Sequence, residues 1–363
     1  MLRIKDFSVP CDDETPLAQL AAQRLGVRAE EIVSVAIVRK AVDARRYHGA
    51  PLLFVFVLDV AVRQERAVLA RLRRDRKVER RQPQPRPPIL ERPLGKGERR
   101  PVVVGFGPAG MFAALTLARA GQVPLVLERG QDVDTRHRDI LSFWHGGAFS
   151  PTSNVQFGEG GAGTFSDGKL TTRISDPHMR DVLEAFVAAG APQEILYLHK
   201  PHIGTDLLRT VVKNLREEIR RLGGEVRFGA QVTDVELAGG RHAAVIVAGE
   251  ERGGPEAAVV GIGHSARDTY EMLYARGLAM EAKAVAVGVR IEHPQDFIDR
   301  AQYGADAGQS RLPVADYALT YQDRETGRGA YSFCMCPGGQ VVAAASEAGR
   351  LVTTGMRNYR RDT

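Results

Sequence analysis

The stretch "VVVGFGPAGMFAALTLARAGQVPLVLERG", Val102 to Gly130, decides the fold class of this 363-residue chain. Its apolar runs and glycine positions predict a buried strand over Val102–Val104, a helix over Pro108–Ala120 and a second strand over Val123–Glu128. A strand, a helix and a strand in this order begin many doubly wound parallel sheets. The sequence therefore predicts an α/β fold built on a parallel sheet.

The glycines between the first strand and the helix have the spacing G-x-G-x-x-G. The first permits a tight turn, the second lets a diphosphate approach the backbone, and the third lets the helix pack closely on the strand. The acid that ends the second strand, Glu128, is placed to accept hydrogen bonds from an adenosine ribose. These features predict a dinucleotide site containing Gly105, Gly107, Pro108, Ala109, Gly110, Glu128 and Arg129.

The residues after Glu128 favour FAD over a nicotinamide cofactor. A long glycine-rich stretch, a helix over 205–222 and several strands within 225–262 precede the closing strand "AAVVGIG". This interrupted sheet is the arrangement of FAD domains of the glutathione-reductase type. The closing strand also begins a second motif, "GIGHSA", which alone would fit an NADP site, with Ser265 and Asp268 as helix caps. An NAD(P)-dependent dehydrogenase therefore stays an alternative, although no full second nucleotide domain follows.

Several further motifs resemble one family: "SNVQFGEGGAGTFSDGKLTTR", "KPHIGTD", "GHSARDTYEML", "VGVRIEHPQ" and "FCMCPGG". With the first stretch, they are similar to FAD-dependent dehydrogenases of unassigned substrate, distant relatives of geranylgeranyl reductases and other glutathione-reductase-type flavoproteins. The resemblance implies non-covalent FAD and hydride-transfer chemistry. It also places five further residues at the cofactor: Gly160, Gly161, Gly163, Val232 and Gly263.

The octapeptide "GTFSDGKL", Gly163 to Leu170, looks like a phosphate-binding P-loop. A P-loop needs Ser or Thr after its lysine and a helix behind it, and here Leu170 and the β-branched "LTTRIS" follow. We therefore expect no triphosphatase. The polar side chains of this loop and of "HKPHIGTD" give the candidates for catalysis, which are Lys169, Arg173, Lys200 and His202.

The chain divides into four parts by composition. We expect a small α+β domain over 1–81, including a basic helix over Gln64–Arg80, and then a Pro/Arg-rich linker over 82–98. An FAD domain over 99–276 and part of a β-rich substrate domain over 277–363 follow. Related flavoproteins close the FAD site with a late Gly-Asp motif, and no Gly-Asp dipeptide occurs here. We therefore expect a chain that is C-terminally truncated relative to that family.

The net charge of +6 is unevenly distributed, because residues 63–100 hold fourteen Lys/Arg and only five Asp/Glu. A flavin-bearing RNA-binding protein that uses this segment is a further alternative, but no aromatic residues interleave with the arginines to stack on bases. We expect a small-molecule substrate, NAD(P)H as a possible electron donor, no metal, and no nucleic acid. Neither a signal peptide nor an apolar run of membrane-spanning length occurs, so we expect a cytoplasmic protein.

Overall fold

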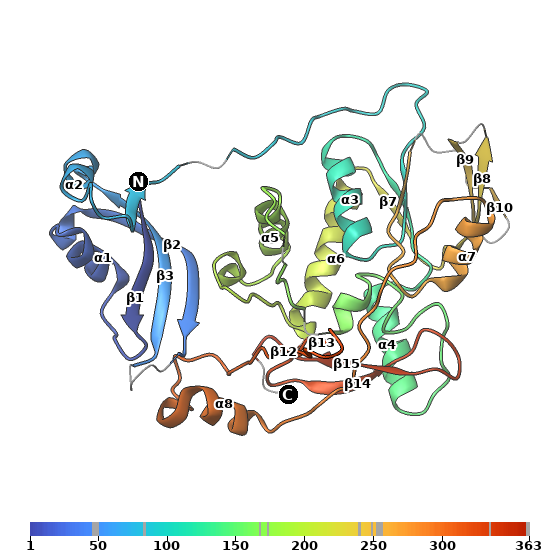
Figure 1. The fold of residues 1–363 in the computed structure, drawn as a ribbon. Helices are drawn as coiled ribbons and strands as arrows, with labels where there is room; N and C mark the ends of the chain where they lie inside the picture. The colour runs from blue at the N-terminus through green and yellow to red at the C-terminus, as the bar shows by residue number, and fades with distance from the viewer. Residues whose placement is uncertain are drawn as a thin grey trace.

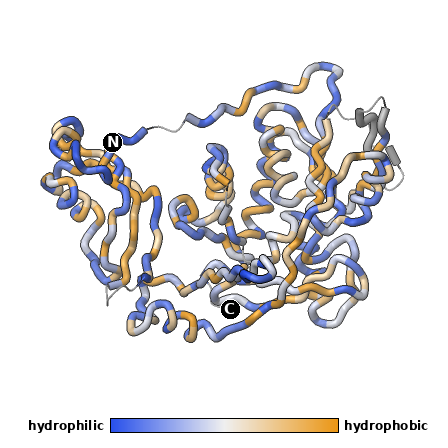
Figure 2. The backbone as a smooth tube through the Cα atoms, viewed as in Figure 1, coloured by the Kyte–Doolittle hydropathy of each residue, from blue (hydrophilic) through white to orange (hydrophobic). Residues whose placement is uncertain are grey.

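The computed structural model describes residues 1–45, 51–82, 85–166, 168–172, 174–238, 241–247, 250–251, 257–333 and 335–360. Figure 1 shows an N-terminal unit and a larger α/β unit, joined along one side by a long extended trace. Hydrophobic residues gather in the strands of both units (Figure 2). No helix in these ranges combines the length and the apolar character needed to cross a bilayer.

The N-terminal unit is a four-stranded antiparallel sheet covered by two helices. Its elements are β1 (Leu2–Pro10), α1 (Leu17–Leu25), β2 (Ile32–Asp43), β3 (Leu53–Val62), α2 (Glu65–Arg71) and β4 (Val78–Arg80), and the strand order is β2-β3-β1-β4. The prediction of one helix over Gln64–Arg80 is wrong. The helix ends at Arg71 because Val78 is buried in β4, where it pairs with Ile4 of β1.

The core of this unit includes a segment from the other end of the chain. Helix α8 (Gln295–Tyr303) and the residues after it contribute Ile298, Tyr303 and Ala315, all buried in the same cluster as Leu2, Phe54 and other side chains of β1 and β3. Asp299 holds this segment in place, since its carboxylate accepts hydrogen bonds from Gln295 and from the Ala315 amide. Two regions almost 300 residues apart therefore share one core.

The larger unit is built on a parallel sheet of β5 (Val102–Val104), β6 (Leu125–Leu127), β7 (Glu225–Arg227) and β11 (Ala258–Val260), in the order β11-β5-β6-β7. Helices α3 (Pro108–Arg119), α5 (Met179–Ala188) and α6 (Thr205–Arg221) pack against Val103 and Val126 on one face. Residues Val102 and Val104 face the antiparallel strands β8 (Val232–Ala238) and β9 (Arg241–Val247) instead. Burial on both faces explains why these strands are continuous apolar runs.

The predicted meander is confirmed: β8, β9 and β10 (Glu250–Glu251) form a separate antiparallel sheet between β7 and β11. The remaining elements are α4 (Val133–Trp144), α7 (Arg267–Ala275) and two hairpins, β12 (Thr320–Gln322) with β13 (Gly329–Tyr331) and β14 (Gln340–Ala344) with β15 (Val352–Met356). Trp144 joins α4 to β14 by donating to the Ala343 carbonyl.

The proline-rich segment 85–98 contains no helix or strand, but it is held at both ends. Arg86 pairs with Asp181 and Glu184 of α5, and this lowers the pKa of Glu184 to about 2. Farther along, the Leu94 amide donates to the Gly121 carbonyl at the end of α3. The segment therefore lies against the α/β unit.

We predict that Ile298→Ala destabilises the N-terminal sheet, although Ile298 is far from it in sequence. Removing this buried side chain should lower the free energy of unfolding by about 2–4 kcal/mol. Amide hydrogen exchange in β1 and β3 should accelerate with it. The control is Phe297→Ala at the neighbouring position, which is 60% exposed. Unchanged exchange in β1 and β3 would show that the two regions do not share a cooperative core.

Candidate functional site

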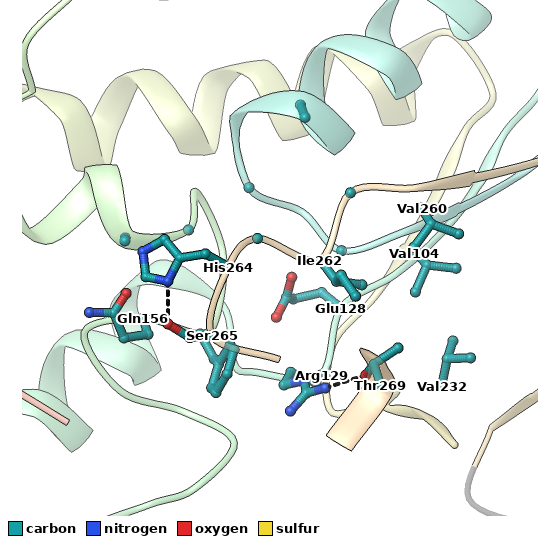
Figure 3. A pocket seen from close by; sticks show the side chains of 18 of the residues that line it. Val104, Glu128, Arg129, Gln156, Val232, Val260, Ile262, His264, Ser265 and Thr269 are labelled. Carbon is teal, nitrogen blue, oxygen red and sulfur yellow. Dashed lines mark hydrogen bonds between the residues drawn. The ribbon is translucent and has the colours of Figure 1, made fainter. Parts of the chain in front are cut away.

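A cavity of about 480 Å³ lies where β5, β6 and β11 end and α3 begins. The loop 156–163 and helix α7 complete its walls (Figure 3). The carboxyl ends of parallel strands meet at one edge of the sheet, which is where α/β folds bind their ligands. The predicted cofactor residues that line this cavity are Gly105, Gly107, Pro108, Ala109, Glu128, Arg129, Gly161, Gly163, Val232 and Gly263.

The glycines leave the backbone of the α3 turn open to a ligand. Gly105 has φ +91°, a conformation that favours glycine, and a Cβ on Gly107 would lie 3.7 Å from the Cα of Gly161. The two backbones thus face each other without side chains between them. Gly110 does not line the cavity; a Cβ there would collide with the Gly105 carbonyl oxygen. It therefore allows α3 to pack closely on the β5 turn.

Glu128 joins three separate segments of backbone at the cavity. Its Oε2 accepts a hydrogen bond from the Phe106 amide at 2.6 Å, and its Oε1 accepts from the amides of Gly130 at 2.9 Å and Gly158 at 3.1 Å. A carboxylate offers about four acceptor positions, and these bonds use three of them. One position, on Oε2, is left for a ligand. The side chain is buried, so these hydrogen bonds are shielded from bulk water.

Arg136 of α4 holds the loop that carries Gly158. This side chain is fully buried and donates to the carbonyls of Asn154, Val155 and Glu159 at 2.6–3.0 Å, and more weakly to that of Gly158. Burial lowers the pKa of Arg136 to about 9, which still leaves it a cation at neutral pH. The guanidinium therefore stabilises the turn in which the Gly158 amide faces Glu128.

Gly160 lies behind the cavity wall and does not line it. Its amide donates to the Phe106 carbonyl at 2.9 Å, and a Cβ would collide with the Thr164 hydroxyl. The neighbouring Glu159 is buried and accepts from the Val133 amide and from Arg216 at 2.8 Å. Its desolvation raises its pKa. These contacts fix the loop to the first turn of α4 and to α6.

Arg129 closes the cavity against α7. It donates to Asp268 at 3.0 Å and to Thr269 at 2.8 Å, and its guanidinium lies 4.5 Å from the centre of the Phe157 ring. The prediction that Ser265 and Asp268 cap α7 is wrong. The helix begins after Ala266 without a side-chain cap, and Asp268 instead accepts from Arg129 and Gln231.

Sequence analysis missed several polar residues of the cavity, among them Gln156, His264, Ser265 and Tyr270. The Ser265 hydroxyl lies 2.8 Å from Nδ1 of His264, and the Tyr270 hydroxyl donates to the Gly263 carbonyl at 2.9 Å. The motif "GHSARDTY" contains three of them, but its sequence indicates a helix cap for Ser265 and gives no signal that these side chains face a cavity.

The described candidates for catalysis lie outside the lining of this cavity. Lys169 and His202 pair in an isolated antiparallel bridge, and the Lys169 ammonium lies 3.8 Å from Sγ of Cys336. His202 is buried, with Nε2 3.0 Å from the Tyr359 carbonyl oxygen. Lys200 forms an exposed ion pair with Asp316 at 2.7 Å. Arg173 falls outside the described residues, and the catalytic roles of all four stay predictions.

We predict that Arg136→Lys loosens the wall of the cavity. An ammonium group has three donors on a flexible stem and cannot match the planar fork that reaches four carbonyls. The free energy of unfolding should fall by about 2–5 kcal/mol. Amide exchange at 156–160 should accelerate more than exchange in α5. The control is Arg138→Lys, an exposed position two residues away. Equal exchange in both variants would exclude the proposed clamp.

Comparison with known proteins adds a family and a cofactor to this geometry. Residues 284–363 match the model of the family "FAD-dependent protein, C-terminal domain-like", and residues 1–60 match a domain of unknown function, DUF8436. The family description specifies FAD, and FAD is the cofactor of this chain. Among the described residues, no group of three or more His, Cys, Asp or Glu side chains is arranged to hold a metal.

Two solved structures illustrate a weaker likeness. THI4 of Thermovibrio ammonificans is 15% identical, with 50% of this chain and 63% of that chain covered and a TM-score of 0.30. Thioredoxin reductase of Lactococcus lactis is 20% identical, with 46% and 37% covered and a TM-score of 0.25. Similarity at this level does not establish a shared fold.

A sequence relative gives the family. An uncharacterized protein of Clostridium beijerinckii is 48% identical over 369 residues, and the match covers 99% of this chain and 67% of that protein. This identity extends through the N-terminal unit, the cavity and the C-terminal hairpins. The chain therefore belongs to the same family as this Clostridium beijerinckii protein.

Proposed function

We propose that the chain is an FAD-dependent oxidoreductase of glutathione-reductase-like fold, which transfers a hydride between its flavin and a small-molecule substrate. The observation that carries this proposal is the cavity itself, where a bare glycine backbone, a helix N-terminus and a buried acid converge. The FAD-dependent family description of the C-terminal residues supports the same cofactor.

The cavity suits the diphosphate of a dinucleotide. Helix α3 begins with Pro108 after Gly107, and its first turn contains no acidic residue. The free amides and the positive end of the helix dipole at such an N-terminus favour an anion. Because Gly107 and Gly161 face each other without side chains, a diphosphate can approach both backbones.

The adenosine end fits the wall formed by β6 and α7. The remaining acceptor position on Oε2 of Glu128 would take one ribose hydroxyl. This is fewer than the two hydroxyls that a free carboxylate would accept, because backbone amides already occupy the other positions. Val232 and Arg129, which also line the cavity, would flank the adenine.

The strand arrangement supports the glutathione-reductase-like subtype and a single nucleotide site. The three-stranded antiparallel sheet is inserted between β7 and β11, and β11 then returns beside β5. This brings the second glycine motif to the first, because Gly261 and Gly263 line the same cavity as Gly105 and Gly107. A separate NAD(P) site at "GIGHSA" therefore receives no support from the geometry.

The bound flavin would supply hydride acceptance and donation, and the protein would bind and orient it. Figure 3 shows His264 and Ser265 on the side of the cavity away from Arg129 and Val232, and Gly163 also lines the cavity. We propose that a small-molecule substrate approaches from this side and that NAD(P)H is the electron donor. Lys169, Arg173, Lys200 and His202 remain the candidates for proton transfer.

The basic segment 63–100 is not needed for this function. Several of its arginines are paired with acids: Arg80 with Glu65, Arg81 with Asp59, and Arg86 with two residues of α5. Such pairing is typical of a solvated structural surface. We therefore propose no nucleic-acid partner for this segment.

Glu128→Gln should weaken FAD binding by roughly one to two orders of magnitude, because charge-assisted hydrogen bonds are worth about 1.5–3 kcal/mol. The new amide NH₂ would also face backbone N–H donors, so the thermal midpoint of the apoprotein should fall. Titration of FAD into apoprotein, followed by flavin fluorescence, measures the affinity. The control is Glu236→Gln, an exposed carboxylate on β8. Equal affinity in both variants would place the cofactor elsewhere.

Electron transfer is tested with the holoprotein under anaerobic conditions. NADH or NADPH should bleach the visible absorbance of the bound flavin faster than it bleaches free FAD at the same concentration. Bleaching no faster than that of free FAD with either nucleotide would exclude NAD(P)H as the donor. A reduced holoprotein that no small-molecule acceptor reoxidises faster than free reduced flavin would argue against an oxidoreductase.

A further inference from the structure

The segment 278–294, between α7 and α8, is an extended chain with no helix or strand. Figure 1 draws it as a long orange trace that is neither a helix nor a strand. Every side chain in the segment is exposed. Between residues 279 and 293, no backbone amide or carbonyl makes a backbone hydrogen bond to another described residue. An exposed backbone of this kind is open to pairing with a further strand.

Residues 284–291, which we name the open strand, have the sequence pattern of a strand inside a sheet. Val285, Val287, Val289 and Ile291 alternate along it and are 83%, 93%, 88% and 66% exposed. The residues that alternate with them are Ala284, Ala286 and Gly288, which are small, and Arg290, whose side chain donates to the Thr353 carbonyl of β15 at 3.4 Å. A period of two with β-branched residues on one face is the pattern of a strand that buries that face against a core.

The exposed apolar surface is concentrated in this part of the chain. Half of the large hydrophobic side chains exposed in the described ranges lie within 284–363, which is less than a quarter of the sequence. Besides the open strand, they include Leu319, Tyr321, Tyr331 and Phe333 around the β12–β13 hairpin. Exposed apolar side chains gathered in one region mark an interaction surface.

The Clostridium beijerinckii protein indicates which polypeptide covers the open strand. This chain spans 67% of the Clostridium beijerinckii protein, so a third of that protein lies outside the match. We propose that the open strand is the docking surface for this remaining third, which adds strands to its edges and covers its apolar face. The mode is β-strand addition, where backbone bonds give affinity and the valine face gives specificity.

A second copy of the chain fits the surface less well. Two open strands related by a two-fold axis would pair along one edge and leave the other edge of each strand bare. Side chains on both faces of the open strand are exposed, so a polypeptide that supplies at least two strands is required to cover it. The remaining third of the relative is large enough for this.

Amide hydrogen exchange in this chain and in the Clostridium beijerinckii protein tests the proposal. In this chain the amides of 284–291 should exchange at nearly the rate of an unstructured peptide. In the full Clostridium protein, the matching stretch should exchange at least roughly 100-fold more slowly, because its amides are paired in a sheet. Exchange at the same fast rate in both proteins would overturn the proposal.

Co-expression gives a second measurement. The remaining third of the relative, tagged, should co-purify with this chain, and Val287→Asp should reduce the retained fraction at least tenfold. The control is Val33→Asp on β2, where the valine is also largely exposed at 66%. Loss of binding in both variants would show a nonspecific contact and contradict the proposal. A dimer of the chain alone that Val287→Asp converts to monomer would assign the surface to a second copy instead.

Discussion

The buried carboxylate of Glu128 joins the parts of the chain that form the cavity. It accepts amide hydrogen bonds from the β5–α3 turn, from the residue two positions after it and from the loop at Gly158. If this carboxylate were absent, three buried amides would lose their partner, and each unpaired buried donor costs about 1–3 kcal/mol. Glu128 is therefore both a candidate ligand-binding residue and the hydrogen-bonding centre of the site.

Arg136 supports that centre from behind. Its bonds to the carbonyls of the loop 154–159 fix the turn in which the Gly158 amide faces the opposite direction, toward Glu128. The cation Arg136 thus binds carbonyls on one side of this loop, and the anion Glu128 binds the Gly158 amide on the other side. Both side chains are buried, and that of Arg136 completely. The loop can then present Gly161 to Gly107 with no side chain between the two backbones.

The two ends of the chain depend on each other in a similar way. The N-terminal sheet is completed by Ile298, Tyr303 and Ala315, while the segment that leads to them, 278–294, lies exposed across the molecule. Buried side chains therefore follow directly after exposed ones in the sequence. The buried side chains after residue 294 belong to a complete core, whereas the exposed side chains before it form a surface that is suited to a partner.

The sequence by itself determined the βαβ unit, the inserted meander and the places of Gly105, Gly107 and Glu128 at the cavity, because these follow from local spacing and turn chemistry. The resemblance to flavoproteins, and not the spacing, placed Gly161, Gly163, Val232 and Gly263 there. Only the tertiary structure decided that Gly160 packs behind the cavity wall and that Asp268 pairs with Arg129 instead of capping α7. Likewise, Val78 ends the predicted basic helix by pairing with β1, and α8 enters the N-terminal core. Each of these outcomes depends on which distant segments meet, and the periodicity of a short stretch contains no information about its partner across the chain.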